Sequence, residues 1–338
     1  MLSKTEISSN FWSDKHVFIT GATGFVGSWL VKKLLSYGSY VVTLVRDADP
    51  QSELFRSGDI NKVYVVNGKI EDYLTLERAI NEHEIDTVFH LAAQPIVGVA
   101  LRYPLQTFES NIRGSYNLLE ACRTHSQFVK RVVIASSDKA YGDQINLPYT
   151  EDMPLQGQFP YEVSKSCTDL ISQCYHKTYQ LPVAIARCGN IYGGGDLNWS
   201  RIIPGTIRSL LQGKAPIIRS DGKFVRDYIF IDDVIDAYLI LAERLNDWQV
   251  TGNAFNFSPE RPVSVGEITE IIRRIMNRME LEPIILNNVT HEIRSQYLSS
   301  KKANVILGWK PSYSIDQGIN STINWYKDFL KNDKSATD

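Results

Sequence analysis

Residues 16–27, with the sequence HVFITGATGFVG, join a short apolar segment of strand character to the start of an amphipathic helix. Three glycines stand at the junction: Gly21 permits a tight turn, Gly24 lets the backbone approach a pyrophosphate, and Gly27 lets the helix pack closely on the strand. A glycine-rich turn can be purely structural, but one placed between a first strand and a helix favours dinucleotide binding. The residues predicted to bind the dinucleotide here are the three glycines together with Thr23, Phe25 and Val26.

The same order, a short apolar segment followed by a helical one, continues as far as Arg187. Several of these segments are apolar at consecutive positions, as expected for strands that are covered by helices on both faces. Strands are predicted at residues 16–20, 40–45, 63–66, 87–91, 131–135 and 183–186, and helices at 25–37, 73–82, 104–125 and 161–179. The expected fold class is therefore α/β, a Rossmann-like, doubly wound parallel sheet with a smaller C-terminal α/β region that binds the substrate.

The pattern changes after Arg187, where three glycines run together at residues 193–195 and loops marked by Pro and Gly separate the helices. We expect residues 1–188 to form an NAD(P)-binding Rossmann domain to which residues 226–257 return. Residues 189–225 and 258–330 are assigned to the substrate-binding region, and residues 331–338 to a loose tail.

The composition excludes several classes of function. The chain has 338 residues, and its 36 Lys+Arg against 38 Asp+Glu give no basic surplus of the kind that marks nucleic-acid binders. No apolar run approaches the length of a membrane span, and the first residues lack the apolar core of a signal peptide. Four cysteines without a CxxC pair and six scattered histidines predict neither a disulfide framework nor a metal site. We therefore expect a cytoplasmic protein with no nucleic-acid or membrane partner.

Two residues at the end of the second predicted strand bear on the choice of cofactor. Arg46 could pair with a 2'-phosphate, which favours NADP, although it could also stack on adenine or be solvated. Asp47 could accept a hydrogen bond from a free 2'-hydroxyl, which favours NAD. The residues predicted to line the cofactor farther along the chain are Ile70, Leu91, Ala92, Ala93, Tyr161 and Lys165.

A second set of chemically active side chains follows the fifth predicted strand. Tyr161 and Lys165 lie four residues apart and so share one face of a helix. A nearby ammonium, together with oxidised nicotinamide, lowers the pKa of a phenol from about 10 toward neutrality and lets it act as a base. Ser137, at the end of the strand, could hold the substrate hydroxyl that Tyr161 deprotonates. A Tyr-x-x-x-Lys pattern alone often marks two surface residues, and the glycine turn upstream is what favours catalysis here.

These motifs resemble the extended short-chain dehydrogenase/reductase family, and within it the nucleotide-sugar dehydratases and epimerases, over nearly the whole chain. The resemblance rests on the glycine turn, HLAAQ at residues 90–94, ESNIRGSYNLLEA at 109–121, and the Ser137, Tyr161 and Lys165 set. The chain is more similar still to the CDP-glucose 4,6-dehydratases. The matching segments are FW at 11–12, GSWL at 27–30, SDK at 137–139, GN at 189–190 and GGGD at 193–196.

The resemblance implies a 4,6-dehydration of a nucleotide diphosphate sugar, with NAD(P)+ tightly bound and recycled. It assigns Asp138 as the acid toward the C6 oxygen and Lys139 as the base at C5, where other dehydratases carry Glu. The subgroup is associated mainly with NAD, whereas Arg46 favours NADP. Two alternatives stay open: Asp138 and Lys139 as a solvated loop pair in an enzyme that is a 4-epimerase, and a non-catalytic dinucleotide-binding sensor.

The resemblance also places the substrate. It sets the amide of Asn190 against the diphosphate and carries three arginines to the nucleotide and phosphates, where guanidinium groups pair bidentately with oxygens. Each arginine alone is commonly a surface or ion-pair residue. The residues predicted to bind substrate are Gln94, Asn190, Arg201, Arg226 and Arg294. The helices at 104–125 and 161–179 resemble those that form a four-helix bundle, so a homodimer is expected.

Overall fold

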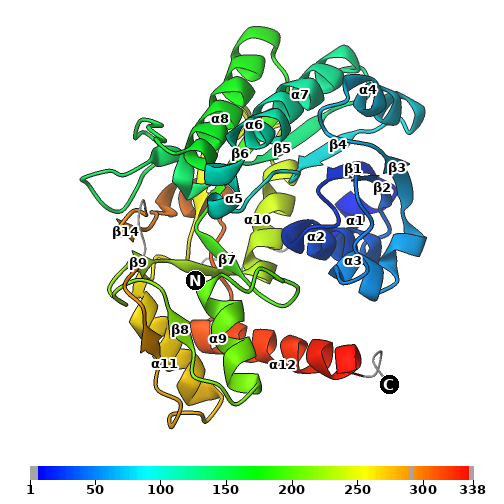
Figure 1. Ribbon diagram of the computed structural model, residues 1–338. Helices are drawn as coiled ribbons and strands as arrows, with labels where there is room; N and C mark the ends of the chain where they lie inside the picture. Colours follow the sequence, from blue (N-terminus) through cyan, green and yellow to red (C-terminus); the bar gives the residue numbers. More distant parts are fainter. Residues whose placement is uncertain (1–6, 289–291, 335–338) are drawn as a thin grey trace.

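The structure is a computed structural model that describes residues 7–288 and 292–334, and a parallel sheet lies at its centre (Figure 1). The order of its strands is β11-β6-β5-β4-β1-β2-β3, and each neighbouring pair is parallel. The strands are β1 (His16–Thr20), β2 (Tyr40–Val45), β3 (Tyr64–Asn67), β4 (Thr87–His90), β5 (Arg131–Ala135), β6 (Val183–Cys188) and β11 (Ala254–Phe257). The predicted α/β, doubly wound fold class is confirmed.

The strand order reverses at β1, because the chain first moves outward to β2 and β3 and then returns to β4 on the other side of β1. In doubly wound folds, ligands bind outside the carboxyl ends of the strands at such a reversal. The glycine turn follows β1 and the HLAAQ segment ends the neighbouring β4, so the topology brings both motifs to this position.

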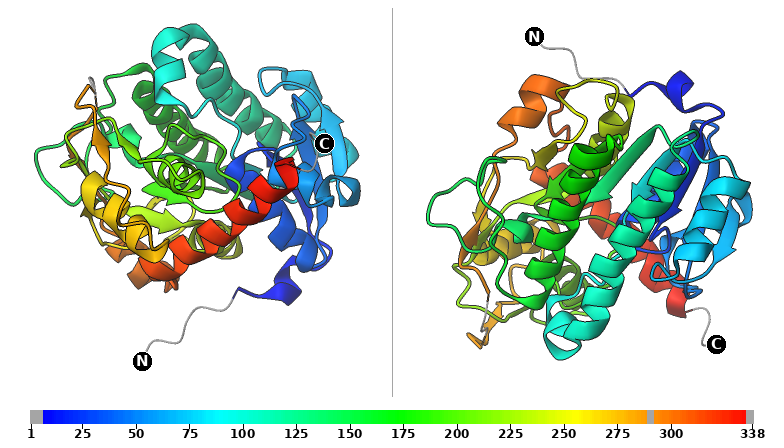
Figure 2. Two further views of the ribbon diagram at one scale, coloured as in Figure 1. Left: turned by 60° about the horizontal axis from the view of Figure 1, so that its bottom comes forward. Right: turned by 90° about the horizontal axis from the view of Figure 1, so that it is seen from above.

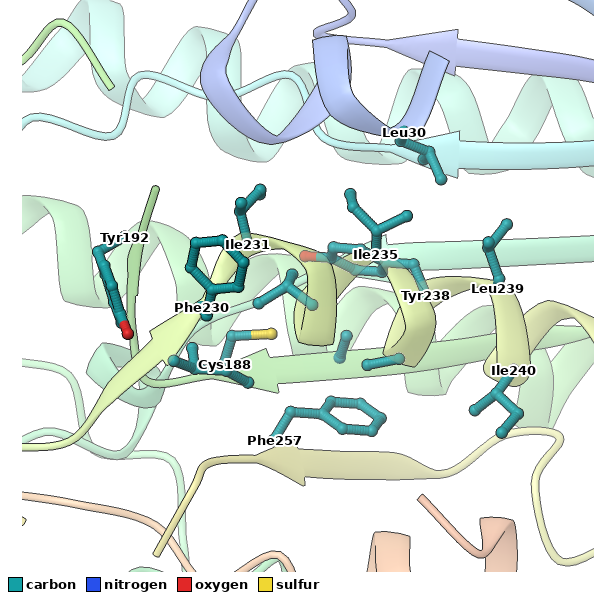
Figure 3. Packing of buried hydrophobic residues seen from close by; sticks show 14 of the residues in the cluster. Leu30, Cys188, Tyr192, Phe230, Ile231, Ile235, Tyr238, Leu239, Ile240 and Phe257 are labelled. Atoms are coloured by element: carbon teal, nitrogen blue, oxygen red, sulfur yellow. The ribbon is translucent and has the colours of Figure 1, made fainter. Parts of the chain in front are cut away.

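Helices cover both faces of the sheet, which is why its strands are apolar at consecutive positions. Val17 and Ile19 of β1 face one core cluster, and Phe18 between them faces the other. In the first cluster, Ile235 and Leu30 point toward one another from two helices (Figure 3). The helices that pack on the sheet are α2 (Phe25–Ser36) and α10 (Ile231–Glu243) in the first cluster, and α4 (Tyr73–Glu82), α7 (Gly114–Thr124) and α8 (Pro160–Tyr179) opposite them.

The helix predicted at residues 104–125 is interrupted. α6 (Pro104–Phe108) and α7 are separated by a π-helical turn at Glu109–Arg113, and α7 then runs beside α8 along the sheet (Figure 2, right). π-Helical turns are rare in proteins, and those that occur often lie at functional sites. The apolar period did not reveal this one because it shifts the register without removing the apolar face on either side. The other three predicted helices correspond to α2, α4 and α8.

The chain beyond β6 builds a smaller group of helices and short strands beneath the carboxyl ends of the main sheet (Figure 1). Here β9 (Val225–Arg226) lies between β12 (Val263–Ser264) and β14 (Ser295–Gln296), beside α9 (Ile202–Leu211) and α11 (Val265–Ile275). β11, which was not among the predicted strands, pairs with β6 at the edge of the main sheet. The exact division into domains stays a prediction.

The C-terminal helix α12 (Ile315–Lys334) extends into the segment predicted to be a loose tail. Ile319, Ile323 and Tyr326 recur at helical spacing and are buried, which anchors this helix to the rest of the molecule. Residues 331–334 therefore continue a helix, and residues 335–338 lie outside the described part. Among the helices in the described ranges, none is long and apolar enough to cross a membrane.

Candidate active site

The glycine turn after β1 is held so closely that side chains would not fit. Gly21 has a φ of +78°, and a Cβ there would lie 2.6 Å from the Ala92 backbone nitrogen. A Cβ on Gly27 would lie 2.1 Å from the Gly21 carbonyl oxygen. Gly24 is the N-cap of α2, and within the described chain no side chain caps the amides of that helix end. A bare helix N-terminus beside a tight glycine turn fits a dinucleotide pyrophosphate.

The remaining predicted cofactor residues surround this turn unevenly. The backbone atoms of Leu91 and Ala92 lie where a Cβ on Gly21 would stand, so the segment that follows β4 packs directly against the glycine turn. Phe25 instead faces the glycine run at residues 193–195. Ile70 is 7% exposed and packs on Gly114 of α7, so it belongs to the core as well as to the predicted site.

At the end of β2, Arg46 and Asp47 form an exposed ion pair. The Arg46 Nε lies 2.6 Å from Asp47 Oδ2, and the two side chains are 56% and 72% exposed. Both groups that could select the cofactor are therefore paired with one another, and the positive charge of Arg46 is already offset.

Asn111, in the π-helical turn, fixes the loop that follows β4. Its Oδ1 accepts a hydrogen bond of 2.7 Å from the Gln94 backbone nitrogen, and its Nδ2 donates to the Gln94 carbonyl and to Ser164 Oγ. The Gln94 side chain folds back on its own loop, accepting from the Ile96 nitrogen at 2.6 Å. Its role in binding substrate stays a prediction.

The end of β5 leads into a short 3-10 turn that presents three of the predicted catalytic residues. Ser137 caps this turn, accepting from the Lys139 backbone nitrogen at 3.2 Å and donating to Asp138 Oδ1 at 3.0 Å. Asp138 is 3% exposed, and its Oδ2 has no hydrogen-bond partner among the described residues. A buried carboxylate oxygen of this kind is costly unless it meets a ligand.

Tyr161 and Lys165 lie one helical turn apart on α8, facing the end of β5. Lys165 Nζ donates to the Ala135 carbonyl at 2.6 Å, and burial lowers the pKa of its ammonium to about 8. Burial raises the pKa of Tyr161 to about 12, although Arg201 and a hydrogen bond with Ser137 act in the opposite direction. The predicted lowering of the Tyr161 pKa is thus not produced by the protein groups, because desolvation of the phenolate outweighs the nearby cation.

Lys139 contacts a residue that is distant along the chain and that the sequence did not single out. Its Nζ donates to Gln296 Oε1, and Gln296 Nε2 donates to the Asp138 carbonyl at 2.8 Å. Burial lowers the pKa of Lys139, and Arg226 adds to this effect whereas Asp138 opposes it. No motif pointed to Gln296, since the contact spans 157 residues.

The predicted substrate residues differ in how free their side chains are. Asn190 Nδ2 is buried and has no partner among the described residues, as a ligand-binding amide would be. Arg201 pairs with Asp196 Oδ2 at 3.1 Å, and its charge also acts on Tyr161. The roles of Asn190 and Arg201 in binding the substrate phosphates, beside the predicted catalytic residues, stay predictions.

Arg226 and Arg294 are already engaged with protein groups. Arg226 is 7% exposed and donates to the Val225 carbonyl at 2.8 Å and the Ile293 carbonyl at 2.5 Å. Arg294 is 67% exposed and pairs with Asp221 at 3.2 Å. Arg226 therefore also has a structural role, and both assignments to substrate stay predictions.

A buried acid next to Arg226 was also missed. Asp227 is 0% exposed, its Oδ2 accepts from the Leu298 nitrogen at 3.0 Å, and its Oδ1 has no partner within the described chain. Burial, assisted by the charge of Asp138, raises the pKa of Asp227 to about 7. The available signal was an acid inside the apolar segment 224–231.

Comparison with known proteins agrees with these features. The model of the NAD dependent epimerase/dehydratase family matches residues 17–257. The CDP-glucose 4,6-dehydratase of Salmonella typhimurium is 30% identical over 342 residues, which cover 96% of this chain and 94% of the relative. The structure of a UDP-glucose 4-epimerase from Thermotoga maritima, with UDP-glucose, has a TM-score of 0.84 at 27% identity and covers 93% of this chain and 99% of that one.

A solved structure of a 4,6-dehydratase is also similar to this chain. The structure of a dTDP-glucose 4,6-dehydratase from Streptomyces venezuelae, with NAD and TYD bound, has a TM-score of 0.83 at 26% identity and covers 92% of this chain and 97% of that one. The family resemblance inferred from the motifs is confirmed. With its glycine turn, its Tyr-Lys helix and a family match over residues 17–257, the chain belongs to the NAD dependent epimerase/dehydratase family of extended short-chain dehydrogenases/reductases.

Proposed function

We propose that this protein is a nucleotide-sugar 4,6-dehydratase, with a CDP-glucose-like substrate favoured. The observation that carries the proposal is the adjacent pair Asp138 and Lys139 beside Ser137 and Tyr161. Asp138 is buried and Lys139 is half-buried. Oxidation at C4 requires one base, but elimination of water across C5 and C6 requires a further base and an acid. The similarity to the Salmonella CDP-glucose 4,6-dehydratase supports the same assignment.

The cofactor proposed is NAD, tightly held and recycled. The glycine turn, the N-terminus of α2 and the loop at Leu91–Ala93 would hold it, and when bound it takes up two electrons and one proton from sugar C4 and returns them at C6. The ion pair of Arg46 with Asp47 supports NAD over NADP, since the Asp47 carboxylate would repel a 2'-phosphate.

The first chemical task of the protein is to remove the proton of the C4 hydroxyl. Tyr161 is assigned as the base, and Ser137 as the group that orients the hydroxyl. Because burial raises the pKa of Tyr161 to about 12, its deprotonation depends on positive charge gathered at the site, to which Arg201 already contributes. Lys165, whose Nζ donates to the Ala135 carbonyl at 2.6 Å, is assigned as the supporting cation.

The second task is elimination from the 4-keto sugar. Lys139, as a neutral amine, takes the C5 proton, while Asp138, in its protonated form, donates to the C6 oxygen so that water leaves and a C5–C6 double bond forms. A proton then returns to C5 from the Lys139 ammonium, whose protons exchange with solvent, as C6 becomes a methyl group. The lowered pKa of Lys139 favours the neutral amine that this step needs.

The test is incubation of the purified protein with CDP-glucose, dTDP-glucose or UDP-glucose, followed by mass spectrometry. We expect loss of one water without added reductant, transfer of deuterium from C4 to C6, and solvent deuterium at C5. Mass-neutral conversion of all substrates would overturn the proposal.

The second candidate is a 4-epimerase, which the similarity to the Thermotoga UDP-glucose 4-epimerase favours. Tyr161, Lys165 and Ser137 are sufficient for that reaction, because only C4 is oxidised and reduced. Replacing Asp138 and Lys139 would leave an epimerase active, whereas it would abolish dehydration. Product analysis of the two variants therefore separates the candidates.

We also propose a homodimer formed through α6, α7 and α8. Large apolar side chains are exposed along these helices, among them Leu105, Tyr116 and Leu170 at 72%, 41% and 53%. Exposed apolar surface of this kind is typical of an interface. Sedimentation is expected to give a dimer, and a monomer at micromolar concentration would contradict the proposal.

A further inference from the structure

Gln296 lies on a segment that is fixed on both sides. In β14 it is paired in parallel register with Arg226 of β9. The next residue, Tyr297, accepts a hydrogen bond of 2.9 Å from the Tyr149 nitrogen through its carbonyl, and Leu298 donates its nitrogen to Asp227 at 3.0 Å. The Gln296 side chain is fully buried, so its amide has a defined place with no access to solvent.

The partners of this amide also fix its orientation. Its Nε2 donates to the Asp138 carbonyl at 2.8 Å, and its Oε1 accepts from Lys139 Nζ. A carbonyl can only accept and an amine proton can only be donated, so a rotated amide would set oxygen against oxygen. Gln296 therefore hydrogen-bonds both members of the pair: the backbone carbonyl of Asp138 and the side-chain amine of Lys139.

We infer that Gln296 is a positioning residue for dehydration, which holds the Lys139 amine so that its lone pair is directed at the C5 proton. The inference rests on the proposed function. A lysine side chain has a flexible four-carbon stem, and one N–H held by Gln296 Oε1 removes much of that freedom. A displacement of about 1 Å in a reacting group can cost on the order of 100-fold in rate.

The charge at this site allows the role to be tested by pH. The charged groups that act on Lys139 are Asp138 on its own turn, Glu162 on α8, Arg226 on β9, and Glu292. Gln296 adds no charge, but its carbonyl oxygen bonds the ammonium more strongly than the neutral amine. Removal of this acceptor lowers the pKa of Lys139, and replacement by a carboxylate raises it.

The experiment measures kcat for water loss against pH in wild type, Gln296→Leu and Gln296→Glu. Activity rises with pH as Lys139 loses its proton. We expect this rise to move to lower pH in Gln296→Leu, with kcat reduced at least ~10-fold and KM little changed. In Gln296→Glu it moves to higher pH. The control is Gln144→Leu. It removes a half-buried amide that donates to the Tyr141 carbonyl of the same turn at 2.7 Å but makes no contact with Lys139. The pH profile of this variant is expected to match that of wild type.

Profiles that stay at the wild-type pH in both Gln296 variants would overturn the inference, because a purely structural role lowers activity without moving the profile. If Gln296→Leu does not fold, the shift in Gln296→Glu decides alone. Failure of the proposed function is distinct from both outcomes, since the wild-type protein would then release no water from any substrate.

Discussion

Replacing Gly27 with alanine tests whether the glycine turn is shaped for a dinucleotide. The added Cβ would stand 2.1 Å from the Gly21 carbonyl oxygen and 2.8 Å from the Ala22 Cα, roughly 1 Å inside normal contact with backbone atoms that cannot rotate away. The first turn of α2 must therefore move away from Gly21 and Ala22 in the glycine turn. Overpacking of this kind costs about 1–3 kcal/mol of unfolding free energy.

The same displacement carries the amides of α2 away from a pyrophosphate. A loss of about 1.4 kcal/mol in binding, which is tenfold in affinity, is the smallest effect we expect on NAD. The assays are urea unfolding and calorimetric titration with NAD. As a matched control, Gly98→Ala in α5 (Val97–Arg102) adds a Cβ that meets nothing within 4 Å of described atoms, so its NAD affinity should not change and stability should rise by up to about 1 kcal/mol. Wild-type stability and NAD affinity in Gly27→Ala would refute the reasoning.

Three further outcomes are expected. Asp169→Asn breaks a buried bidentate pair with Arg187, at 2.7 and 2.9 Å, and should lower the unfolding free energy by about 3–5 kcal/mol in denaturant melts. The pKa of Asp227 in the folded protein is raised to about 7, so the free energy of unfolding should fall as pH rises from about 4 to 7, by at most about 1.4 kcal/mol per pH unit. In denaturant melts across this range, Asp227→Asn should flatten that slope. Asp138→Asn and Lys139→Ala should each reduce water loss at least ~100-fold, measured by mass spectrometry, while C4 oxidation, followed by nicotinamide absorbance, persists.

Much of the main sheet could be predicted because the signals are local. β1 and the glycine turn are read from neighbouring residues, where a strand, a tight turn and a helix follow within residues 16–27. Tyr161 and Lys165 share a helix face by their spacing alone. In contrast, β11 is short and carries the buried Asn256, so nothing in its pattern distinguishes it from a loop until it pairs with β6.

The site divides in the same way. The chemical identity of the groups proposed to react, a serine, an acid, two lysines and a tyrosine, was predicted from motifs along the chain. Their environment does not: burial raises the pKa of Tyr161 and lowers that of Lys139, and the charge of Asp138 acts on a distant carboxyl at Asp227. Gln296 reaches Lys139 only after β14 docks beside β9. Motifs and periodicity record contacts between near neighbours, whereas desolvation and contacts between distant segments exist only once the chain has packed, and these were decided by the tertiary structure.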